Sequence, residues 1–66
     1  MEIRQVQSFV HVARFGSFSR AAETMGYSQS AITVQIRLLE EELGTKLFDR
    51  MGKKVSLTPQ GKRFLE

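Results

Sequence analysis

The sequence predicts a small, mainly α-helical domain, and three observations lead to that prediction. The chain has 66 residues, which is enough for one domain with a small core. Apolar residues recur at helical spacing as far as residue 43, as they do on the buried face of amphipathic helices. Beyond residue 46 this spacing gives way to two short strand-like runs and a Thr-Pro pair. We therefore expect three helices, a two-stranded hairpin and the start of a further helix.

The first two helices are separated by a glycine and a serine. The first is expected over residues 3–14, and its apolar face consists of Ile3, Val6, Phe9, Val10 and Ala13. Gly16 should end it, and Ser17 can begin the next helix as an N-cap, because its hydroxyl can accept a hydrogen bond from a free amide. The second helix is expected from Phe18 to Met25, and the residues facing inward are Ala21, Ala22 and Met25.

A third helix is expected over residues 29–43, with Ser28 as its N-cap. Its core stripe, at positions i, i+4, i+7 and i+11, consists of Ile32, Ile36, Leu39 and Leu43. Gly44 follows at the position where a left-handed backbone is accessible to glycine.

The pattern then changes to two short strands, expected at residues 47–50 and 54–57 and joined around Met51, Gly52 and Lys53. Thr58 and Pro59 supply an N-cap and a proline at the first helical position. Only residues 60–66 follow, and so short a helix does not stand without packing. We therefore expect a piece of a longer protein, with one domain at 1–57 and the start of a linker helix at 58–66.

The second and third helices carry the spacing of a helix-turn-helix. Ala22, Gly26 and Ile32 stand at relative positions 0, +4 and +10. Such a unit needs a small residue where the helices cross, a glycine in the turn and an apolar residue that locks the second helix. A three-helix packing without a ligand satisfies the same pattern, so the spacing alone leaves both interpretations open. With the hairpin, the predicted fold class is a winged helix-turn-helix.

The outward face of the third helix favours DNA as the ligand. Its first turns expose Gln29, Ser30, Thr33, Val34 and Arg37. Short or amide-bearing side chains suit a helix end that enters the major groove. The carboxylates at 40–42 are expected to form a solvated patch, in which Glu41 is close enough to pair with Arg37. Since a duplex repels carboxylates, we expect the N-terminal half of this helix to dock.

The net charge of +3 is distributed unevenly along the chain. Residues 46–63 carry a net +5, so the remaining residues carry −2. A basic end indicates a polyanionic partner, nucleic acid before membrane, because no basic amphipathic stretch is long enough for membrane anchoring. Arg50, Lys53 and Lys54 cluster at the hairpin tip. An isolated basic hairpin would be a solubilising loop, whereas beside a helix-turn-helix it reaches phosphates or the minor groove.

Composition argues against several other classes of function. The chain has no cysteine and a single histidine, His11, so we expect neither a disulfide framework nor a metal site. We expect no enzyme either, because His11 has no serine–acid partner nearby and consecutive carboxylates point in different directions around a helix. No apolar stretch is long enough for a membrane span, and the N-terminus has no secretory signal, so the expected compartment is the cytoplasm.

Four segments carry a resemblance to a known family: FGSFSRAA at 15–22, SQSAITVQIRLLE at 28–40, ELGTKLFDR at 42–50 and LTPQG at 57–61. They resemble the N-terminal DNA-binding domain of LysR-type transcriptional regulators. The resemblance implies a winged helix-turn-helix, a long linker helix from Thr58 and an effector-binding domain beyond it. It also implies dimers or tetramers that bind promoter DNA with dyad symmetry and respond to a small-molecule co-inducer.

The resemblance also implies roles for individual residues. In the family, positions matching Gln29, Ser30 and Thr33 touch bases, and wing positions matching Arg50 and Lys53 contact the DNA backbone or minor groove. Thr33 stands where serine is usual, and Val34 stands where a basic or polar residue is common. The candidate DNA-binding residues are Ser17, Ser28, Gln29, Ser30, Thr33, Val34, Arg37, Arg50, Lys53 and Lys54. We expect no cofactor in these residues, because the co-inducer belongs to the effector domain.

Two functions remain open at this point. The first is sequence-specific binding of double-stranded DNA in bacterial transcription regulation, and the second is a small basic interaction module that binds RNA or an acidic protein. Preference for one palindromic duplex over bulk DNA and RNA distinguishes them. We expect the 66 residues alone to be monomeric and the full-length protein to be a homodimer or tetramer.

Overall fold

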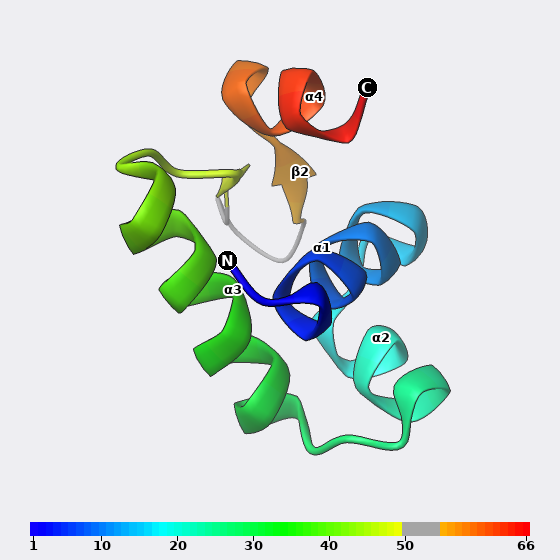
Figure 1. The fold of residues 1–66 in the computed structure, drawn as a ribbon. Coiled ribbons are helices and arrows are strands. Elements are labelled where there is room, and N and C mark those ends of the chain that lie inside the picture. Colours follow the sequence, from blue (N-terminus) through cyan, green and yellow to red (C-terminus); the bar gives the residue numbers. More distant parts are fainter. Residues whose placement is uncertain (50–54) are drawn as a thin grey trace.

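The structure, a computed structural model, describes residues 1–49 and 55–66. In these residues the elements, in chain order, are α1 (Ile3–Phe15), α2 (Phe18–Met25), α3 (Gln29–Leu43), β1 (Phe48–Asp49), β2 (Ser56–Leu57) and α4 (Pro59–Leu65) (Figure 1). We call β1, β2 and the chain between them the wing. The predicted fold class, a mainly helical winged helix-turn-helix followed by a further helix, is confirmed.

Local sequence explains where the helices begin and end. The Ser17 hydroxyl accepts a hydrogen bond from the Arg20 N–H at 3.2 Å, and the Ser28 hydroxyl accepts one from the Ala31 N–H at 3.2 Å, so both N-cap predictions are confirmed. Thr58 caps α4 in the same way, with Pro59 in the first turn as predicted. The first three helices each end at a glycine in the left-handed region.

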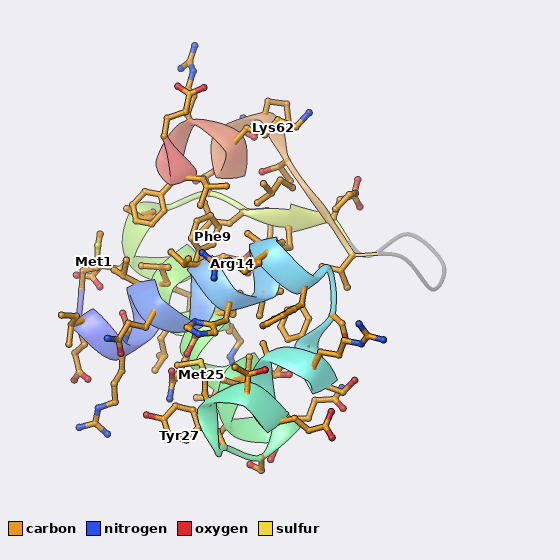
Figure 2. The ribbon with its side chains drawn as sticks, turned by 90° about the vertical axis from the view of Figure 1, so that its right-hand side faces the viewer. Met1, Phe9, Arg14, Met25, Tyr27 and Lys62 are labelled. Carbon is orange, nitrogen blue, oxygen red and sulfur yellow. The ribbon has the colours of Figure 1, made fainter. Side chains whose placement is uncertain are left out.

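The core lies where α1 meets α2, α3 and the wing. Its buried apolar residues are Phe9, Val12, Phe18, Ala21, Ala22, Ile32, Ile36, Leu39, Leu47 and Phe48. The Phe9 ring centroid is 5.3 Å from that of Phe48 and 5.2 Å from that of Phe64, so this ring joins α1 to β1 and α4. Phe9 accordingly lies inside the molecule in Figure 2, while α4 and α2 occupy opposite ends in both views.

Two features of α1 differ from the sequence prediction. Ile3 was expected on the buried face, but it is 73% exposed because it lies at the very start of the helix, beyond the core. Ser8 is fully buried, and its hydroxyl donates a hydrogen bond to the Gln35 side-chain oxygen, which joins α1 to α3. This bond satisfies the buried hydroxyl.

The strands of the wing are shorter than predicted. They are antiparallel, with Phe48 opposite Leu57 and Asp49 opposite Ser56. Leu47 is buried but precedes β1, because its N–H points to Glu40 on α3 rather than to a partner strand. The predicted strand residues Arg50 and Lys54, and the predicted turn between them, lie outside the described residues.

Candidate nucleic-acid interface

The crossing of α2 and α3 has the geometry that the three-residue spacing predicts. Ala22 is 4% exposed and Ile32 is fully buried, so the small and the apolar residue both lie in the helix contact. Gly26 has φ of +73°, and a Cβ there would meet nothing within 4 Å. Glycine is therefore required by the backbone conformation of the turn rather than by lack of space. The helix-turn-helix prediction is confirmed.

The predicted outward face of α3 points away from the core. Gln29, Ser30, Val34 and Arg37 are exposed and Thr33 is half-buried. In the core stripe of the same helix, Ile32, Ile36 and Leu39 are buried and Leu43 is half-buried. The face therefore has the orientation that the prediction requires. Contact of these residues with DNA stays a prediction.

The polar groups of this face differ in how they are engaged. The Thr33 hydroxyl donates to the Gln29 carbonyl oxygen at 3.1 Å, and the Ser30 hydroxyl lies 3.2 Å from that of Ser28. The Gln29 side-chain amide has no hydrogen-bond partner within residues 1–49 and 55–66. Its donor and its acceptor are both available to a ligand.

Apolar side chains extend this face further along α3. Val34 is 41% exposed and Leu38 is 45% exposed, and they stand four residues apart on the same side of the helix. Leu38 was not among the predicted site residues. The core stripe could have predicted that Leu38 is exposed, because at 3.6 residues per turn position 38 lies on the face of the helix away from the buried positions.

Ser17 and Ser28 lie at the N-termini of α2 and α3. Each hydroxyl already accepts a hydrogen bond from the first turn of its own helix, at Arg20 and Ala31 respectively. Their role as direct DNA contacts stays a prediction.

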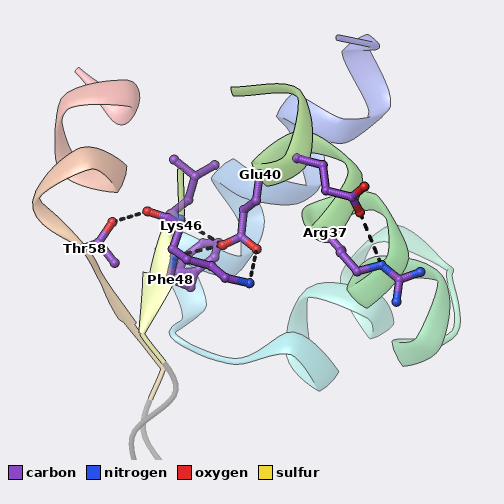
Figure 3. A network of polar contacts seen from close by, with 7 residues as sticks. Arg37, Glu40, Lys46, Phe48 and Thr58 are labelled. Carbon is purple, nitrogen blue, oxygen red and sulfur yellow. Dashed lines mark hydrogen bonds and ion pairs between the residues drawn. The ribbon is translucent and has the colours of Figure 1, made fainter. Parts of the chain in front are cut away.

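The acidic residues after this face are not one solvated patch. Glu41 and Glu42 are exposed, and Arg37 Nε lies 3.8 Å from Glu41 Oε2, as predicted. The prediction for Glu40 is wrong, since its side chain is only 12% exposed. The chain after α3 turns back alongside the helix and presents backbone N–H groups to this carboxylate, as Figure 3 shows.

Arg50, Lys53 and Lys54 lie outside the described residues. At the base of the wing, Lys46 has a side chain that is 78% exposed.

His11 Nδ1 lies 2.8 Å from the Gln7 carbonyl oxygen, one turn earlier on α1, which is a structural contact. No group of His, Asp and Glu side chains that could hold a metal ion occurs within the described part of the chain. None of the helices at residues 1–49 and 55–66 has the length and apolar character needed to cross a membrane.

Comparison with known sequences identifies close relatives. The chain is 50% identical over 66 residues to the HTH-type transcriptional regulator TfdT of Cupriavidus pinatubonensis, which covers 100% of this chain and 29% of that protein. It is 45% identical over 64 residues to the uncharacterized HTH-type transcriptional regulator YwqM of Bacillus subtilis, covering 97% of this chain and 22% of the relative. The chain therefore spans less than a third of the length of either protein.

Solved structures of DNA-binding domains are also similar to this chain. The DNA-binding domain of BenM, in complex with benA site 1 DNA, has a TM-score of 0.94 and 40% identity and covers 98% of this chain and 73% of that chain. A complex of the CbnR DNA-binding domain with DNA has a TM-score of 0.94 and 40% identity, covering 98% of this chain and 75% of that chain.

The crossing of α2 and α3 and the wing beside it define the class of the protein as a winged helix-turn-helix. Residues 3–62 match the family described as bacterial regulatory helix-turn-helix protein, lysR family. The chain belongs to this family. The resemblance seen in the sequence is thereby confirmed, and these residues match a family of regulatory helix-turn-helix proteins rather than an enzyme family.

Proposed function

We propose that this domain binds double-stranded DNA in a sequence-specific manner and serves bacterial transcription regulation. The exposed N-terminal half of α3 carries the proposal, since it presents two hydroxyls, a valine and the Gln29 amide, which has no hydrogen-bond partner among residues 1–49 and 55–66. A helix end of this kind fits the major groove, where base edges offer donors, acceptors and thymine methyl groups. The related domains solved in DNA complexes support the proposal at 40% identity.

On this proposal, four residues of α3 read base edges. The Gln29 amide can form two hydrogen bonds with an adenine, and the Val34 methyl groups can pack on a thymine methyl. Ser30 and Thr33 keep acceptor capacity on their hydroxyl oxygens, since each hydroxyl oxygen has two lone pairs.

Arg37 and the two capping serines are assigned to phosphates. An exposed ion pair such as Arg37–Glu41 contributes only about 0–1 kcal/mol, so Arg37 can exchange Glu41 for a phosphate. Ser17 and Ser28 mark helix N-termini, where free N–H groups and the helix dipole favour an anion.

The wing is assigned to the DNA backbone or minor groove through Arg50, Lys53 and Lys54. Sequence alone supports this assignment, because six basic residues and a single acidic residue fall within 46–63. Lysine and arginine bound to phosphates release counterions, which makes the affinity depend on salt.

For the whole protein, family membership supports a wider set of proposals. We propose that residues 1–57 form the DNA-binding domain and that residues 58–66 begin a linker helix that leads to an effector-binding domain. A small-molecule co-inducer would bind there, and the full-length protein would be a homodimer or tetramer in the cytoplasm. The relatives, three to five times as long as this chain, leave room for such a domain.

Selection of bound duplexes from a random pool tests the proposal. The expected result is enrichment of one sequence motif, with Gln29→Ala relaxing one position of that motif. Gln60→Ala is the matched control, because Gln60 is an exposed glutamine on α4, at the opposite end of the molecule from α2 (Figure 1). Binding to RNA or to an acidic protein with no preference among duplexes would favour the alternative function, which the basic segment 46–63 alone also allows.

A further inference from the structure

Residues 46–48 lie between α3 and α4, and their backbone is hydrogen-bonded to both sides (Figure 3). On the α3 side, one carboxylate oxygen of Glu40 accepts hydrogen bonds from two consecutive N–H groups, that of Leu47 at 2.8 Å and that of Phe48 at 3.3 Å. Hydrogen bonds to an ionised acceptor are stronger than neutral ones, and Glu40 is largely withdrawn from water.

On the α4 side, Thr58 bonds to the same segment. Its hydroxyl donates to the Lys46 carbonyl oxygen at 2.6 Å, and its backbone N–H donates to the Leu47 carbonyl oxygen at 3.0 Å. The same hydroxyl accepts a hydrogen bond from the Gly61 N–H at 3.0 Å, which caps α4. One side chain therefore both starts α4 and ties it to residues 46–48.

Gly61 brings α4 directly onto this segment. A Cβ at this position would lie 2.2 Å from the Leu47 carbonyl oxygen and 2.9 Å from Leu57 Cδ2. Real Cβ atoms do not approach so closely, so the first turn of α4 can occupy this place only with glycine at position 61. The position of α4 is thus set against the same carbonyl that Thr58 bonds.

An apolar contact also holds α4, since Phe64 packs edge-on against Phe9 of α1 with ring centroids 5.2 Å apart. Apolar attraction is non-directional, whereas hydrogen bonds weaken steeply when their angle is wrong. The Phe64 contact therefore keeps α4 on the molecule without fixing its direction, whereas the hydrogen bonds of Thr58 to residues 46 and 47 are directional.

We propose that Glu40 and Thr58 are positioning residues that join α3 to α4 through residues 46–48 and hold the two helices at one fixed angle. The proposal rests on the proposed function in one respect, namely that α3 reads DNA. Where α4 continues as a linker helix, a change in the direction of that helix then also changes the orientation of α3 and of the base of the wing.

The first experiment needs no DNA. Residual dipolar couplings of the 66-residue chain report the mutual orientation of α3 and α4, and amide hydrogen exchange reports the Leu47 N–H. Glu40→Ala should change that orientation and speed exchange of the Leu47 amide by about tenfold or more, because two N–H groups lose a charged acceptor. Glu40→Gln should keep the wild-type orientation of α3 and α4, since its amide oxygen can still accept both bonds, and should speed exchange of the Leu47 amide less than Glu40→Ala, because only the charge and its ion pair with Lys46 are lost.

Two further variants make the result specific. Glu42→Ala is the matched control, because it removes the same charge from the same helix at an exposed position whose ion pair is with the N-terminus of the chain. Thr58→Val removes only the hydroxyl contacts and should also turn α4 relative to α3. If Glu40→Ala does not fold, this variant shows whether the joint sets the orientation of the two helices. A lower melting temperature with an unchanged orientation of α3 and α4 would show a merely stabilising role and overturn the proposal.

The second experiment uses the duplex enriched in selection. Glu40→Ala should bind it about tenfold or more weakly than Glu42→Ala, and Glu40→Gln should restore the affinity. Equal affinities of the two alanine variants would overturn the proposal, since both lose one negative charge. If the wild type prefers no duplex, the proposed function fails, while the dipolar couplings still decide whether Glu40 and Thr58 join the helices.

Discussion

Gln29, the first residue of α3, is exposed, and its amide has no hydrogen-bond partner in the described part of the chain. We expect Gln29→Ala to weaken binding to the preferred duplex by about 1–3 kcal/mol, because a bidentate contact with adenine is lost. The base preference should relax at one position and stay unchanged elsewhere, as read from a binding-site selection. An unaltered preference, equal to that of Gln60→Ala, would show that α3 docks through another face.

Val34 is an exposed residue of the outward face of α3, and its side chain cannot form a hydrogen bond. We expect Val34→Ile to be tolerated and Val34→Ala to lose affinity at one base position, since the valine methyl groups pack on a thymine methyl. Replacing that thymine by uracil removes the same contact from the DNA side, so the two losses should not add. If Val34→Lys binds all duplexes more tightly without a change in preference, the residue faces the DNA backbone.

The residues that could be predicted from sequence are those whose role depends on their own neighbours. Ser17, Ser28 and Thr58 each cap a helix whose amides lie only a few positions further on. Glu40 and Ser8 were missed because their partners lie 7 and 27 residues away, at Leu47 and Gln35. Nothing in the local pattern shows where the chain returns to meet them.

At the scale of elements, the turn between α2 and α3 depends on the left-handed backbone of Gly26. We expect Gly26→Ala to lower the free energy of unfolding by about 1–2 kcal/mol, because a Cβ is unfavourable in that conformation. Gly26→Asn should lower it less, since asparagine tolerates the left-handed region better. Urea denaturation followed by circular dichroism measures both. Equal losses would indicate crowding at the turn, which the open space around Gly26 argues against.

The wing is the element whose contribution should depend most on salt. We expect Lys53→Ala to lower the slope of log K against log salt concentration by about 0.9, since one phosphate contact and its counterion release are lost. Specific and non-specific duplexes should be weakened alike. Lys62→Ala, which removes the same charge from α4, is the control and should leave the slope unchanged. An unchanged slope for Lys53→Ala would show that this lysine does not contact DNA.

Helices were easier to predict than strands for a physical reason. The apolar stripe of α3 extends over about three turns, and its buried members Ile32, Ile36 and Leu39 all fall where the spacing places them. The strands have two residues each, which is too short for an alternation of apolar and polar residues to be recognised in the sequence. Leu47 illustrates the limit, because it is buried like a strand residue while its N–H is bonded to a helix side chain.

At the scale of the whole molecule, the spacing of Ala22, Gly26 and Ile32 sufficed to predict how α2 and α3 cross, because that contact lies within one short stretch of chain. The joint between α3 and α4 could not be predicted in the same way. It brings together residues 40, 46–48, 58 and 61, and it exists only once the wing has folded back onto α3.

The association state of the 66-residue chain follows from what α4 leaves exposed. Of the two large apolar residues on this helix after Pro59, Phe64 already packs against Phe9, and Leu65 remains 45% exposed. Burying one such side chain contributes about 1.5–3 kcal/mol, whereas associating two chains costs about 4–15 kcal/mol. We therefore expect a monomer in dilute solution that contacts one half-site weakly.

Sedimentation of this chain and of a chain extended through a full linker helix tests that expectation. The longer chain should dimerise and couple two half-sites, and its apparent affinity should rise because the second head binds at a high effective concentration. A stable dimer of the short chain at micromolar concentration would contradict the argument. The interface would then have to use other exposed apolar residues, and Ile3 and Leu38 are the first to substitute by polar residues, since they are 73% and 45% exposed.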